Sequence, residues 1–515
     1  MKKVCLFTLL FGLLTTLGVA QTTTLNGPIV NMTRNGKFFL INDSEDQIVF
    51  VTKQYRTTFV GEFDFLIHRY DKQEHYTVTQ KIDEKIDCRF AYFNDNQATV
   101  IEQSTKGKAV EYLRAQIPSS AEKVKKLSFE PFLQAPLEKY KFSFSHIVYS
   151  PDYSKFAILT ILKPKSSRKI DHIVDVAVFE SNGAQLWHQR QHAHWLVNDQ
   201  IPFYLSNDGT VYIAEFGSYN NPMVHQTDSL HISVYNSDGI WNYAEGFGTD
   251  AIFNCGKAVL KDGRFVVCGV PCPNGRNSRQ LITYLISPDG EVEKEESSIE
   301  INYNDGYVYD ARELNSELGK FHPYFYDIKE LSDGNLMLVG ELNYRDQIGT
   351  SVTIGSSWGF SEIMGYISRN IIVATITDNG EVLNTFTYPR ATVTPEQLFK
   401  TPNLNVPGIF EHDGKISLLY NDHKDNFTSN NRLWHLLYNN QNGKCCVVVA
   451  DAIQEGDFEG KVVYTSGKSS YSQQNSLADQ DEYFHRILSY DNDAVYYLLK
   501  HNNGFRVEKI TWQEE

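Results

Sequence analysis

The stretch Glu330–Leu342, ELSDGNLMLVGEL, places an Asp-Gly pair between two runs of strand-forming residues. It has close relatives in Val259–Val270, VLKDGRFVVCGV, and in Tyr204–Phe216, YLSNDGTVYIAEF. Asp-Gly and Asn-Gly pairs favour tight hairpin turns, because these residues accept the positive φ that such turns require. The repetition therefore indicates one turn of a repeated scaffold rather than a chemical site used three times.

The Asp-Gly and Asn-Gly pairs form two series along the chain. The pairs of the first series start at Asp208, Asp262, Asp333 and Asp413. The pairs of the second series start at Asn182, Asp238, Asp289, Asn379 and Asn442. Each pair of the second series follows an apolar segment, namely HIVDVAVFE, LHISVYN, QLITYLIS, NIIVATIT and LWHLLYN. We predict that these segments are the third strands of successive units, each built as strand, tight turn, strand, longer loop, strand, tight turn, strand.

Weaker copies of the unit extend the repeat in both directions. They begin at KFFLINDSEDQIVFV, CRFAYFNDNQATVIEQ and FSFSHIVYSPDYSKFAILTIL, and a last copy, FHRILSYDNDAVYYLLKHNNGFRVEKITW, stops after its third strand. Four antiparallel strands repeated at this spacing are typical of a propeller blade. The chain thus resembles a secreted bacterial β-propeller. We predict an all-β fold of eight four-stranded antiparallel blades, with seven as the alternative, closed by an N-terminal strand from TTLNGPIVNM.

No specific propeller family is matched by the sequence. The Trp-Asp dipeptide, the kelch double glycine and the sialidase-type Asp-box are all missing from it. The resemblance therefore implies a fold and assigns no functional residue.

The first twenty residues have the pattern of a secretory signal. Lys2 and Lys3 precede the apolar run 4–17, and the small residues 18–20 end at Ala20. We expect a signal peptide over 1–20 that is cleaved near Ala20, a single β-propeller domain over 21–515, and a secreted or periplasmic product. The Lys-Lys start and the Ala-Gln junction resemble secretory signals of Bacteroidetes-type bacteria. No later stretch is long and apolar enough to predict a transmembrane segment.

Composition excludes some partners. The chain has 48 Lys and Arg against 63 Asp and Glu, a formal net charge of −15, and its basic residues form no cluster. A nucleic-acid partner is therefore not expected, since phosphate binding requires such clusters. The counts of 30 Tyr and 31 Phe favour strands. We predict no cofactor and expect a monomer.

Cysteine and histidine leave two alternatives open. If 261–264 form a turn, Cys255 and Cys268 fall nearly opposite each other, so a disulfide from Cys255 to Cys268 or Cys272 is one expectation and buried free thiols are the other. No C-x-x-C pair is present, which argues against zinc. We predict no metal site. His192 and His194 are weak candidates, and the alternative is that they decorate a solvated link.

Long connections concentrate on one rim of the predicted ring. The tight turns occupy one rim, so the variable loops, which include LNYRDQIGTSVTIGSSWGFSEIMGYISR and NDHKDNFTSNNR, share the opposite rim. Aromatic side chains beside Asn, Asp and Arg can stack on sugars or anchor a protein interface. The candidate ligand-binding residues are Trp195, Tyr219, Arg276, Trp358 and Asp422. The alternative is that these side chains only pack the loops onto the ring.

Residues 355–359 fit the G-x-S-x-G pattern of a hydrolase nucleophile elbow. That elbow requires a parallel sheet with crossover helices, whereas this stretch is predicted as a long loop between two blade strands. We therefore do not assign Ser357 as a nucleophile. The apolar spacing of FSEIMGYIS predicts a short amphipathic helix that caps the rim.

The sequence supports two main functional hypotheses. The leading hypothesis is a non-catalytic secreted or envelope binding or scaffold protein, which engages a glycan or an envelope protein through its loop-rich rim. The alternative is a secreted propeller glycoside hydrolase or lyase acting on polysaccharide, in which carboxylates from different blades converge on the central channel. A purely structural subunit of a larger complex is a third possibility. No catalytic residue is assigned, and whether the protein is an enzyme is left open.

Overall fold

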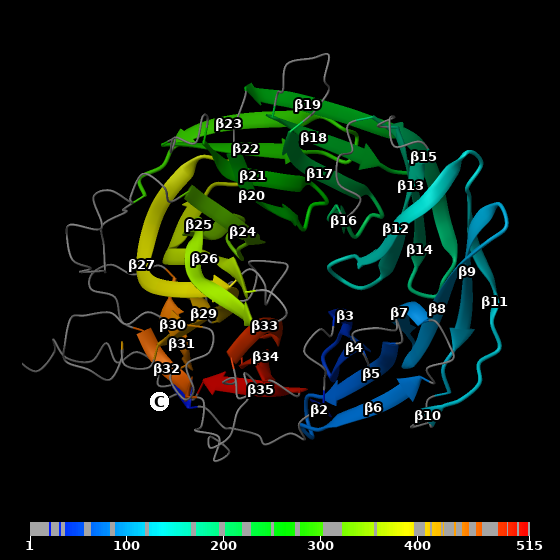
Figure 1. Cartoon of the computed structure of the whole chain (residues 1–515), viewed down its shortest axis with the longest axis horizontal. Helices are drawn as coiled ribbons and strands as arrows, with labels where there is room; N and C mark the ends of the chain where they lie inside the picture. Colours follow the sequence, from blue (N-terminus) through cyan, green and yellow to red (C-terminus); the bar gives the residue numbers. More distant parts are fainter. Residues whose placement is uncertain are drawn as a thin grey trace, which may run out of the picture.

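The structure is a computed structural model in which eight antiparallel sheets are arranged in a ring (Figure 1). It describes residues 20–21, 30–31, 37–55, 63–82, 88–118, 123–165, 171–194, 201–218, 228–248, 252–272, 279–301, 322–354, 358–395, 407–412, 415–423, 426, 437–438, 445–452, 460–465, 483–491, 493–501 and 504–512. Each sheet is one blade of a β-propeller. The prediction of eight blades is confirmed.

The first four blades take up the N-terminal half of the chain. Their strands are β3 (Lys37–Asp43), β4 (Gln47–Tyr55), β5 (Phe63–Asp71) and β6 (Thr77–Ile82); β7 (Cys88–Asn94), β8 (Gln97–Lys106), β9 (Ala109–Gln116) and β11 (Glu130–Pro136); β12 (Tyr140–Tyr149), β13 (Lys155–Pro164), β14 (His172–Glu180) and β15 (Gln185–Ala193); and β16 (Phe203–Leu205), β17 (Val211–Ser218), β18 (Asp228–Tyr235) and β19 (Ile240–Gly248). A short strand, β10 (Lys123–Val124), adds to the edge of blade 1 in parallel with β6.

The last four blades complete the ring. Their strands are β20 (Ile252–Val259), β21 (Phe265–Cys272), β22 (Gln280–Ile286) and β23 (Val292–Ser298); β24 (His322–Glu330), β25 (Leu336–Ile354), β26 (Trp358–Ile376) and β27 (Val382–Pro395); β28 (Gly408–His412), β29 (Lys415–His423), β31 (Cys445–Asp451) and β32 (Gly460–Thr465); and β33 (Tyr483–Tyr490), β34 (Ala494–His501) and β35 (Gly504–Trp512).

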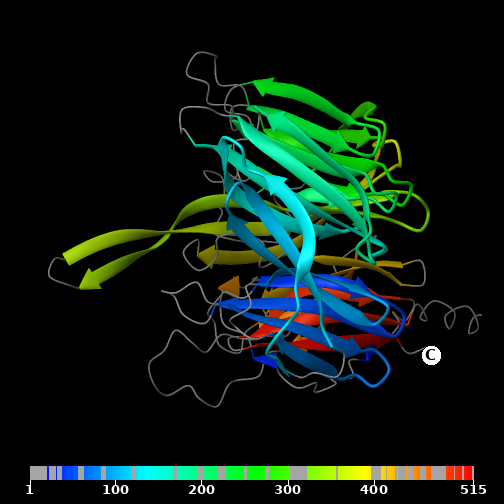
Figure 2. The ribbon, with the colours of Figure 1, turned by 90° about the vertical axis from the view of Figure 1, so that its right-hand side faces the viewer.

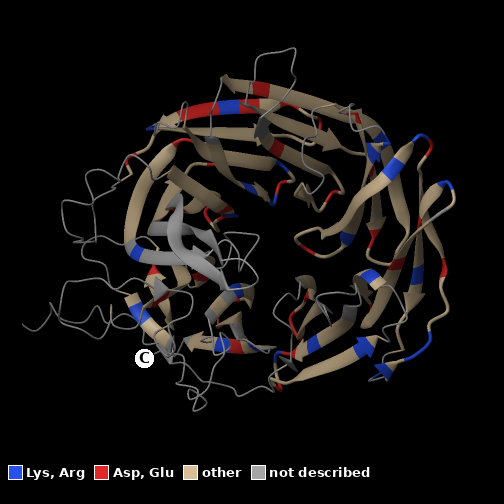
Figure 3. Ribbon diagram, in the orientation of Figure 1, with Lys and Arg blue, Asp and Glu red and all other residues tan. Residues whose placement is uncertain are grey.

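Residue patterns explain the place of each strand within its blade. The second strand of blade 5, β21, is buried along its whole length, because neighbouring blades cover both of its faces. The outer strand β19 instead alternates between half-buried and exposed positions. The outer strand β23 is rich in charge, and Figure 3 shows acidic positions on it, all of them Glu, on both sides of a Lys. Apolar runs therefore lie inside the ring and alternating or charged runs at its circumference.

The hydrophobic core is divided among the blade junctions. The described residues form eight buried clusters, and each joins two adjacent blades. One cluster packs Phe38 and Phe50 of blade 1 against Leu498 and Phe505 of blade 8. The first and last blades are therefore held together by the same kind of packing as every other pair, since a blade cannot bury its two faces alone.

Two short N-terminal strands lie beside the last blade. Strands β1 (Ala20–Gln21) and β2 (Val30–Asn31) both pair antiparallel with β35. Each contact spans two residues, and the residues between them lie outside the described ranges. Closure of the ring by a full N-terminal strand therefore stays a prediction.

The predicted tight turns gather on one rim, which we call the turn rim. The described Asp-Gly and Asn-Gly turns connect the first strand of a blade to its second, or the third to its fourth. Hydrogen bonds join these turns to strands of the preceding blade: Trp187 Nε1 in β15 donates to the Gly209 carbonyl (3.1 Å), and Tyr212 Oη in β17 donates to the Gly263 carbonyl (2.7 Å). The turns are therefore part of the blade junctions, as a scaffold role requires.

Blade 6 differs from the prediction. Strands β25 and β26 are each 19 residues long and form one hairpin that projects from the ring (Figure 2). They stay paired out to Ile354 and Trp358. The expected loop and amphipathic helix over 360–368 are thus wrong, because the cross-strand partners in β25 extend the ladder through this segment. The spacing of apolar residues within one segment contains no information about such a cross-strand partner.

Blade 7 also departs from the prediction. Its third strand is β31, which pairs with β29 and β32, and not the segment LWHLLYN. Within that segment, β30 (Leu437–Tyr438) pairs in parallel with β27 of blade 6. The physical reason is that the Cys-Cys-Val-Val-Val-Ala run of β31 is apolar on both faces, as a strand between two neighbouring blades must be.

The expected disulfide is absent, since all six described cysteines are free thiols. In the β20–β21 ladder, Cys255 lies opposite Gly269 and Cys268 lies opposite Gly256. This one-residue offset places the two cysteine side chains on opposite faces of the blade. Cys272, four residues after Cys268, shares the face of Cys268. The alternative expectation of buried thiols fits Cys268 and Cys272, and Cys255 is half-buried.

Within the ranges described above, no helix has the length and apolar character that crossing a membrane would require.

Candidate functional site

The first strands of the blades lie nearest the axis of the ring (Figure 1), and we call the region that they surround the channel. Strands β3, β12, β16, β20 and β33 together line a pocket of about 350 Å³ in this channel. The β12–β13 turn, with Ser150 and Tyr153, forms part of the wall, so the pocket lies toward the turn rim. A pocket of this volume is large enough for a small ligand or for one unit of a polymer.

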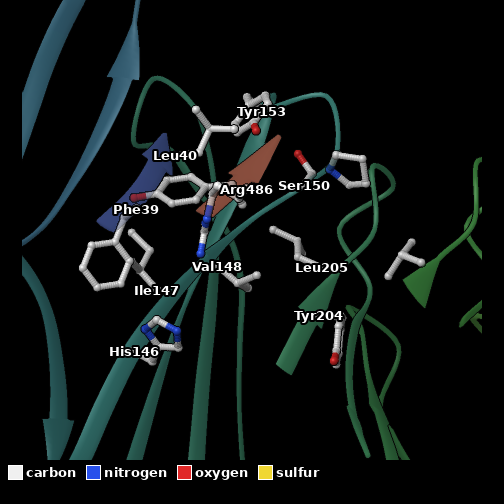
Figure 4. Close-up of a pocket in the computed structure, with 13 residues that line it drawn as sticks. Phe39, Leu40, His146, Ile147, Val148, Ser150, Tyr153, Tyr204, Leu205 and Arg486 are labelled. Carbon is white, nitrogen blue, oxygen red and sulfur yellow. The ribbon is translucent and has the colours of Figure 1, made fainter. Parts of the chain in front are cut away.

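The pocket is lined mainly by aromatic and aliphatic side chains. Its polar members include His146, Tyr153, Tyr204 and Arg486, and none of its described lining residues is Asp or Glu. Figure 4 shows Arg486 in the middle of this group, with Tyr153 above it and His146 below it in the view. Because the protein carries a net charge of −15, a pocket with a cation and no carboxylate is an exception to its overall composition.

Arg486 comes from the first strand of blade 8. It is an exposed residue, and its guanidinium lies 5.2 Å from the centre of the Phe38 ring. Among the residues that the structure describes, Arg486 has no acidic ion-pair partner. The surrounding protein disfavours the charge and lowers the pKa of Arg486, although Tyr153 acts in the opposite direction. Arginine retains its proton in proteins, so Arg486 is a cation without a counter-ion in the pocket.

Packing fixes the aromatic wall. The His146 ring makes edge contacts with Phe39 and Phe203 at centroid distances of 6.1 and 5.8 Å. Tyr149 donates a hydrogen bond to the carbonyl of Ala91 in blade 2. Burial raises the pKa of Tyr149 above its usual range. The phenols therefore stay protonated at neutral pH, and the wall offers ring faces and neutral hydroxyls in a rigid arrangement.

A second cation of the channel, Lys329 in β24, is already engaged. Its Nζ donates to the Ile409 carbonyl (3.2 Å) and lies 3.5 Å from the centre of the Tyr490 ring. Burial lowers the pKa of Lys329 to about 8, while Asp327 and Glu411 oppose that shift. Lys329 therefore differs from Arg486, because protein groups already use its charge.

The acidic groups near the channel are unequally available. Glu411 accepts hydrogen bonds from the backbone and the side chain of Ser332, the former at 3.1 Å. Asp43 forms an ion pair with Lys72 at 2.9 Å. Asp327 is exposed, and burial among protein atoms raises the pKa of its carboxyl. Among the described residues, Asp327 forms no ion pair and no side-chain hydrogen bond, although a backbone hydrogen bond from Ile328 partly offsets the rise of its pKa. None of these three acids belongs to the described lining of the pocket.

For four of the five predicted ligand-binding residues, the structure does not show whether they lie together in one site. Trp195, Tyr219 and Arg276 lie outside the described residues. Trp358 begins β26 and pairs with Ile354 at the far end of the projecting hairpin. The proposal that these residues form one ligand-binding rim therefore stays a prediction.

The fifth residue, Asp422, is placed differently from the expectation. It was predicted as an exposed loop residue, but it lies in β29 and is fully buried. Its Oδ1 accepts hydrogen bonds from the backbone N of His423 (2.7 Å) and from Asn426 Nδ2 (2.9 Å). The reason for the error is register: β29 runs to His423, and Asp422 faces Cys446 of the central strand β31.

Asp422 belongs to a buried polar group at the junction of blades 6 and 7. Arg390 in β27 is fully buried and ion-paired with the equally buried Glu341 in β25. Burial raises the pKa of Asp422 to about 7, and the nearby Arg390 partly offsets this rise. Within the described part of the chain, neither Asp422 Oδ2 nor the Tyr420 hydroxyl has a hydrogen-bond partner. None of these residues lines the pocket in the channel.

The histidines that were weak metal candidates gather around a carboxylate. His192 Nδ1 lies 2.8 Å from Asp171 Oδ1, and His194 Nδ1 lies 3.5 Å from the same oxygen. His188 instead pairs with Asp175 at 2.8 Å. Among the described residues, no group of three His, Cys, Asp or Glu side chains is arranged to hold a metal ion. The histidines therefore lie on the outer strand of blade 3 as partners of acidic side chains.

Sequence reasoning missed the channel pocket. Phe39, His146, Tyr204 and Arg486 come from four different blades and share no motif. The signal that was available is the first strand of each unit, because that strand faces the axis of a propeller. Reading the polar residues of all first strands together would have brought Arg486 and His146 forward as candidates.

Comparison with known proteins assigns this chain to no family. No protein-family model matches the sequence, and no curated protein matches it. Similar solved structures include the polysaccharide lyase Uly1 (10% identity over 94% of this chain and 91% of that one, TM-score 0.36), the β-propeller domain of the Trilobed protease from Pyrococcus furiosus (10%, 68% and 92%, TM-score 0.32) and the α-L-arabinofuranosidase Arb93A from Fusarium graminearum (8%, 72% and 94%, TM-score 0.32). At these identities and TM-scores, the activities of those proteins are not evidence about this chain.

Proposed function

We propose that this protein is an exported, non-catalytic binding protein whose channel pocket holds an acidic glycan. The observation that carries the proposal is Arg486, a cation without a described acidic partner in a pocket with no carboxylate in its lining. A carboxylate of the ligand would supply the missing counter-ion. The channel on the turn side thus takes the place of the loop-rich rim that we expected from the sequence.

The wall chemistry suits a uronic acid unit. A guanidinium binds a carboxylate through two parallel hydrogen bonds, which fixes orientation as well as charge. The rings of Phe39 and Tyr204 offer faces for the C–H groups of a sugar, and the hydroxyls of Tyr153 and Tyr204 can hydrogen-bond its hydroxyl groups. His146 adds a second polar group to the same wall.

The absence of acids from the lining supports binding without catalysis. Glycosidases of the common type use two carboxylates on either side of the bond that is cleaved. Of the three acids described above, Glu411 and Asp43 are held by Ser332 and Lys72. One further acid, Asp327, is not enough for this chemistry.

A hydrolase or lyase is the second candidate, and Asp327 is the observation that favours it. Its raised pKa is a property of general acids, and it is exposed to the channel. Under this alternative, Asp327→Asn would abolish cleavage of an acidic polysaccharide. Under the binding proposal, neither the unmodified protein nor the variant releases any product.

Binding and cleavage can be tested together. The mature protein would be titrated calorimetrically with oligosaccharides of polygalacturonate and of alginate, and the mixtures would then be analysed by chromatography. We expect binding without products, and Arg486→Gln should weaken it roughly 10- to 100-fold, which is the worth of a charge-assisted hydrogen bond. Arg264→Gln is the matched control, because Arg264 is a surface arginine paired with Asp262 at 2.6 Å.

The ligand offers its own control. Carboxyl-reduced oligosaccharides keep the shape of the sugar and lose the charge, so they should lose the part of the affinity that depends on Arg486. Equal affinity for the acidic and reduced forms, equal affinity of Arg486→Gln and the unmodified protein, or the release of products would each overturn the proposal.

Export is part of the same proposal and rests on the signal pattern of residues 1–20. N-terminal sequencing of the protein recovered from the periplasm or the medium of its native host should begin near Gln21. Recovery of the chain with Met1 from the cytoplasm would contradict export without affecting the channel chemistry.

A further inference from the structure

A second cavity lies outside the channel, at the turn-rim end of blade 2. It has a volume of about 470 Å³, and its wall includes residues of β7, β8 and β9 together with Asn182 from the β14–β15 turn of blade 3. It is therefore a cleft between two blades. Its volume falls in the range of small-ligand sites.

The face of blade 2 that packs on blade 3 changes character before it reaches the turn rim. In the middle of the blade this face carries Phe90, Ile101 and Tyr112, which pack against Phe156 of blade 3. Propeller blades need such apolar faces in order to stack. The cleft begins where this apolar packing ends.

Nearer the turns, the same face becomes polar. Register places Tyr92 opposite Thr99, Asn94 opposite Gln97, and Thr99 opposite Gln116, so these side chains share the face that carries Phe90 and Ile101. All five of these residues line the cleft. Amide and hydroxyl groups thus occupy positions where packing against blade 3 would favour apolar side chains.

These polar groups have unused hydrogen-bonding capacity. Thr99 is 5% exposed, and among the described residues its hydroxyl has no hydrogen-bond partner. In the same ranges, the side chains of Gln97 and Gln116 also have none. A nearly buried hydroxyl that opens into a cleft without a protein partner is costly unless water or a ligand satisfies it. The wall is therefore built to accept and donate several hydrogen bonds.

Arg114 is the one cation among the described lining residues of the cleft and is already paired, and the lining also holds the acids Asp95 and Glu130, which separates the cleft from the channel pocket. Arg114 Nε donates to Glu130 Oε1 at 2.7 Å, and Arg114 Nη1 donates to the Gly183 carbonyl at 3.3 Å. The guanidinium also lies 5.1 Å from the centre of the Phe132 ring. With its cation held in this way, the cleft has no unpaired positive charge to offer an anion.

We infer that this cleft is a second ligand site, specific for a neutral, hydroxyl-rich sugar unit. Amide side chains and hydroxyls donate and accept in equal measure, as the hydroxyl groups of a neutral sugar do. The inference goes beyond the proposed channel function, because it concerns another site and a ligand of another charge. A glycan with both neutral and acidic units would then have two points of attachment on the turn side of the ring.

An extended peptide is the competing occupant, and the geometry disfavours it. A peptide that adds to a sheet pairs along an edge strand and places alternate side chains in pockets. The cleft instead is lined by side chains on the face of three adjacent strands, β7, β8 and β9. A ligand there crosses the strand ends and meets amides and hydroxyls rather than a free backbone edge.

The test uses the full mature chain and a variant with minimal change in shape. Thr99→Val keeps the volume of the side chain and removes its hydroxyl, and Gln97→Ala removes the neighbouring amide. The probes are cellohexaose, xylohexaose and mannohexaose, titrated by ligand-observed NMR and calorimetry. We expect at least one probe to bind, and the double variant to weaken that binding at least about tenfold, as the loss of two hydrogen bonds requires.

Two comparisons keep the sites apart. Arg486→Gln should leave neutral-probe affinity within about twofold, and Thr99→Val with Gln97→Ala should leave uronate affinity within about twofold. Thermal unfolding of the double variant should match that of the unmodified protein, which excludes a folding defect. Failure of all three probes to bind, binding that the double variant does not weaken, or preferential binding of an extended peptide library would overturn the inference. None of these outcomes would affect the uronate test of the channel.

Discussion

Arg390 and Arg486 show two ways in which this ring accommodates a positive charge. Arg390 lies at the junction of blades 6 and 7, is fully buried, and is ion-paired with Glu341. Arg486 lies in the channel, is exposed, and has no acidic partner among the described residues. The same side chain is thus committed to the fold at one place and available at the other.

The difference follows from the cost of removing water. An arginine taken fully out of water requires a counter-ion, since its desolvation costs several kcal/mol. An arginine that keeps some contact with water in a channel can stay unpaired at a smaller cost, which is expressed here in the lowered pKa of Arg486, and a ligand carboxylate can later replace that water. Exposure, and not residue type, therefore separates a structural charge from a binding charge in this protein.

Removing both carboxylates beside Arg390 is expected to have the largest effect. In Glu341→Gln with Asp422→Asn, the buried guanidinium keeps neither acidic neighbour, which should lower the free energy of unfolding by about 3–5 kcal/mol. Glu341→Gln alone should cost less, because Asp422 can ionise and take over the pairing. Urea unfolding at pH 7 measures both variants. Additive effects of the two single changes would contradict this coupling.

Asp422→Asn alone should stabilise the protein at high pH. Burial raises the pKa of Asp422 from 3.8 to about 7, so the folded state holds its proton more tightly than the unfolded state does. The stabilisation from protonated Asp422 is fully present below about pH 4 and is lost as the pH rises toward 7. Above pH 7 the group causes no further change in the free energy of unfolding. The slope is about 1.4 kcal/mol per pH unit in that window.

The Asp422→Asn variant is expected to lack this slope. At pH 8 its free energy of unfolding should be about 2–4 kcal/mol higher than that of the unmodified protein. Chemical unfolding at pH 4, 5, 6, 7 and 8 measures the two curves. Parallel curves would show that Asp422 is ionised in the folded state throughout, which its burial at the blade junction does not favour.

Two turn glycines test how the turn rim is held. Gly290 and Gly334 have φ of +88° and +85°, which L-residues adopt at a cost. A Cβ at Gly290 would lie 2.6 Å from the Cβ of Trp241, whereas a Cβ at Gly334 meets no atom within 4 Å. Gly334→Ala should therefore cost about 1 kcal/mol and Gly290→Ala about 2–3 kcal/mol. Equal thermal shifts would show that the contact with Trp241 relaxes freely.

Arg486→Gln is expected to have the smallest effect on stability. Because the guanidinium has no described acidic partner and is exposed, its removal should change the free energy of unfolding by less than about 0.5 kcal/mol. Urea unfolding beside the binding assay measures this. A loss of several kcal/mol would mean that Arg486, like Arg390, is a structural charge, and the contrast between them would fail.

Local signals predicted the blades because each signal is complete within a few residues. The Asp-Gly turn at Asp333 needs only its own φ preference, and the runs on either side of it need only their alternation and apolar content. The prediction of secondary structure failed where a segment takes its conformation from a strand elsewhere in the sequence. The segment 360–368 reads as a helix by itself and is a strand because β25 pairs with it.

The candidate site was predicted poorly for the same reason. Asp422 was selected from a polar stretch that resembles a loop, and the register of β29 with β31 buries it instead. Arg486 was not selected, because nothing in its own neighbourhood distinguishes it. Its availability depends on which side chains the other blades bring into the channel.

The sequence by itself determined the number of blades, the positions of most tight turns and the apolar character of the central strands, since these depend on local backbone preference and on the two-residue period of a strand. Only the tertiary structure decided which charges are solvated and which are buried, which face of its blade each cysteine occupies, and which residues meet in the channel and in the cleft of blade 2. Those properties depend on how strongly each side chain is solvated in the folded protein. That solvation is set by chain segments that are hundreds of residues apart in the sequence.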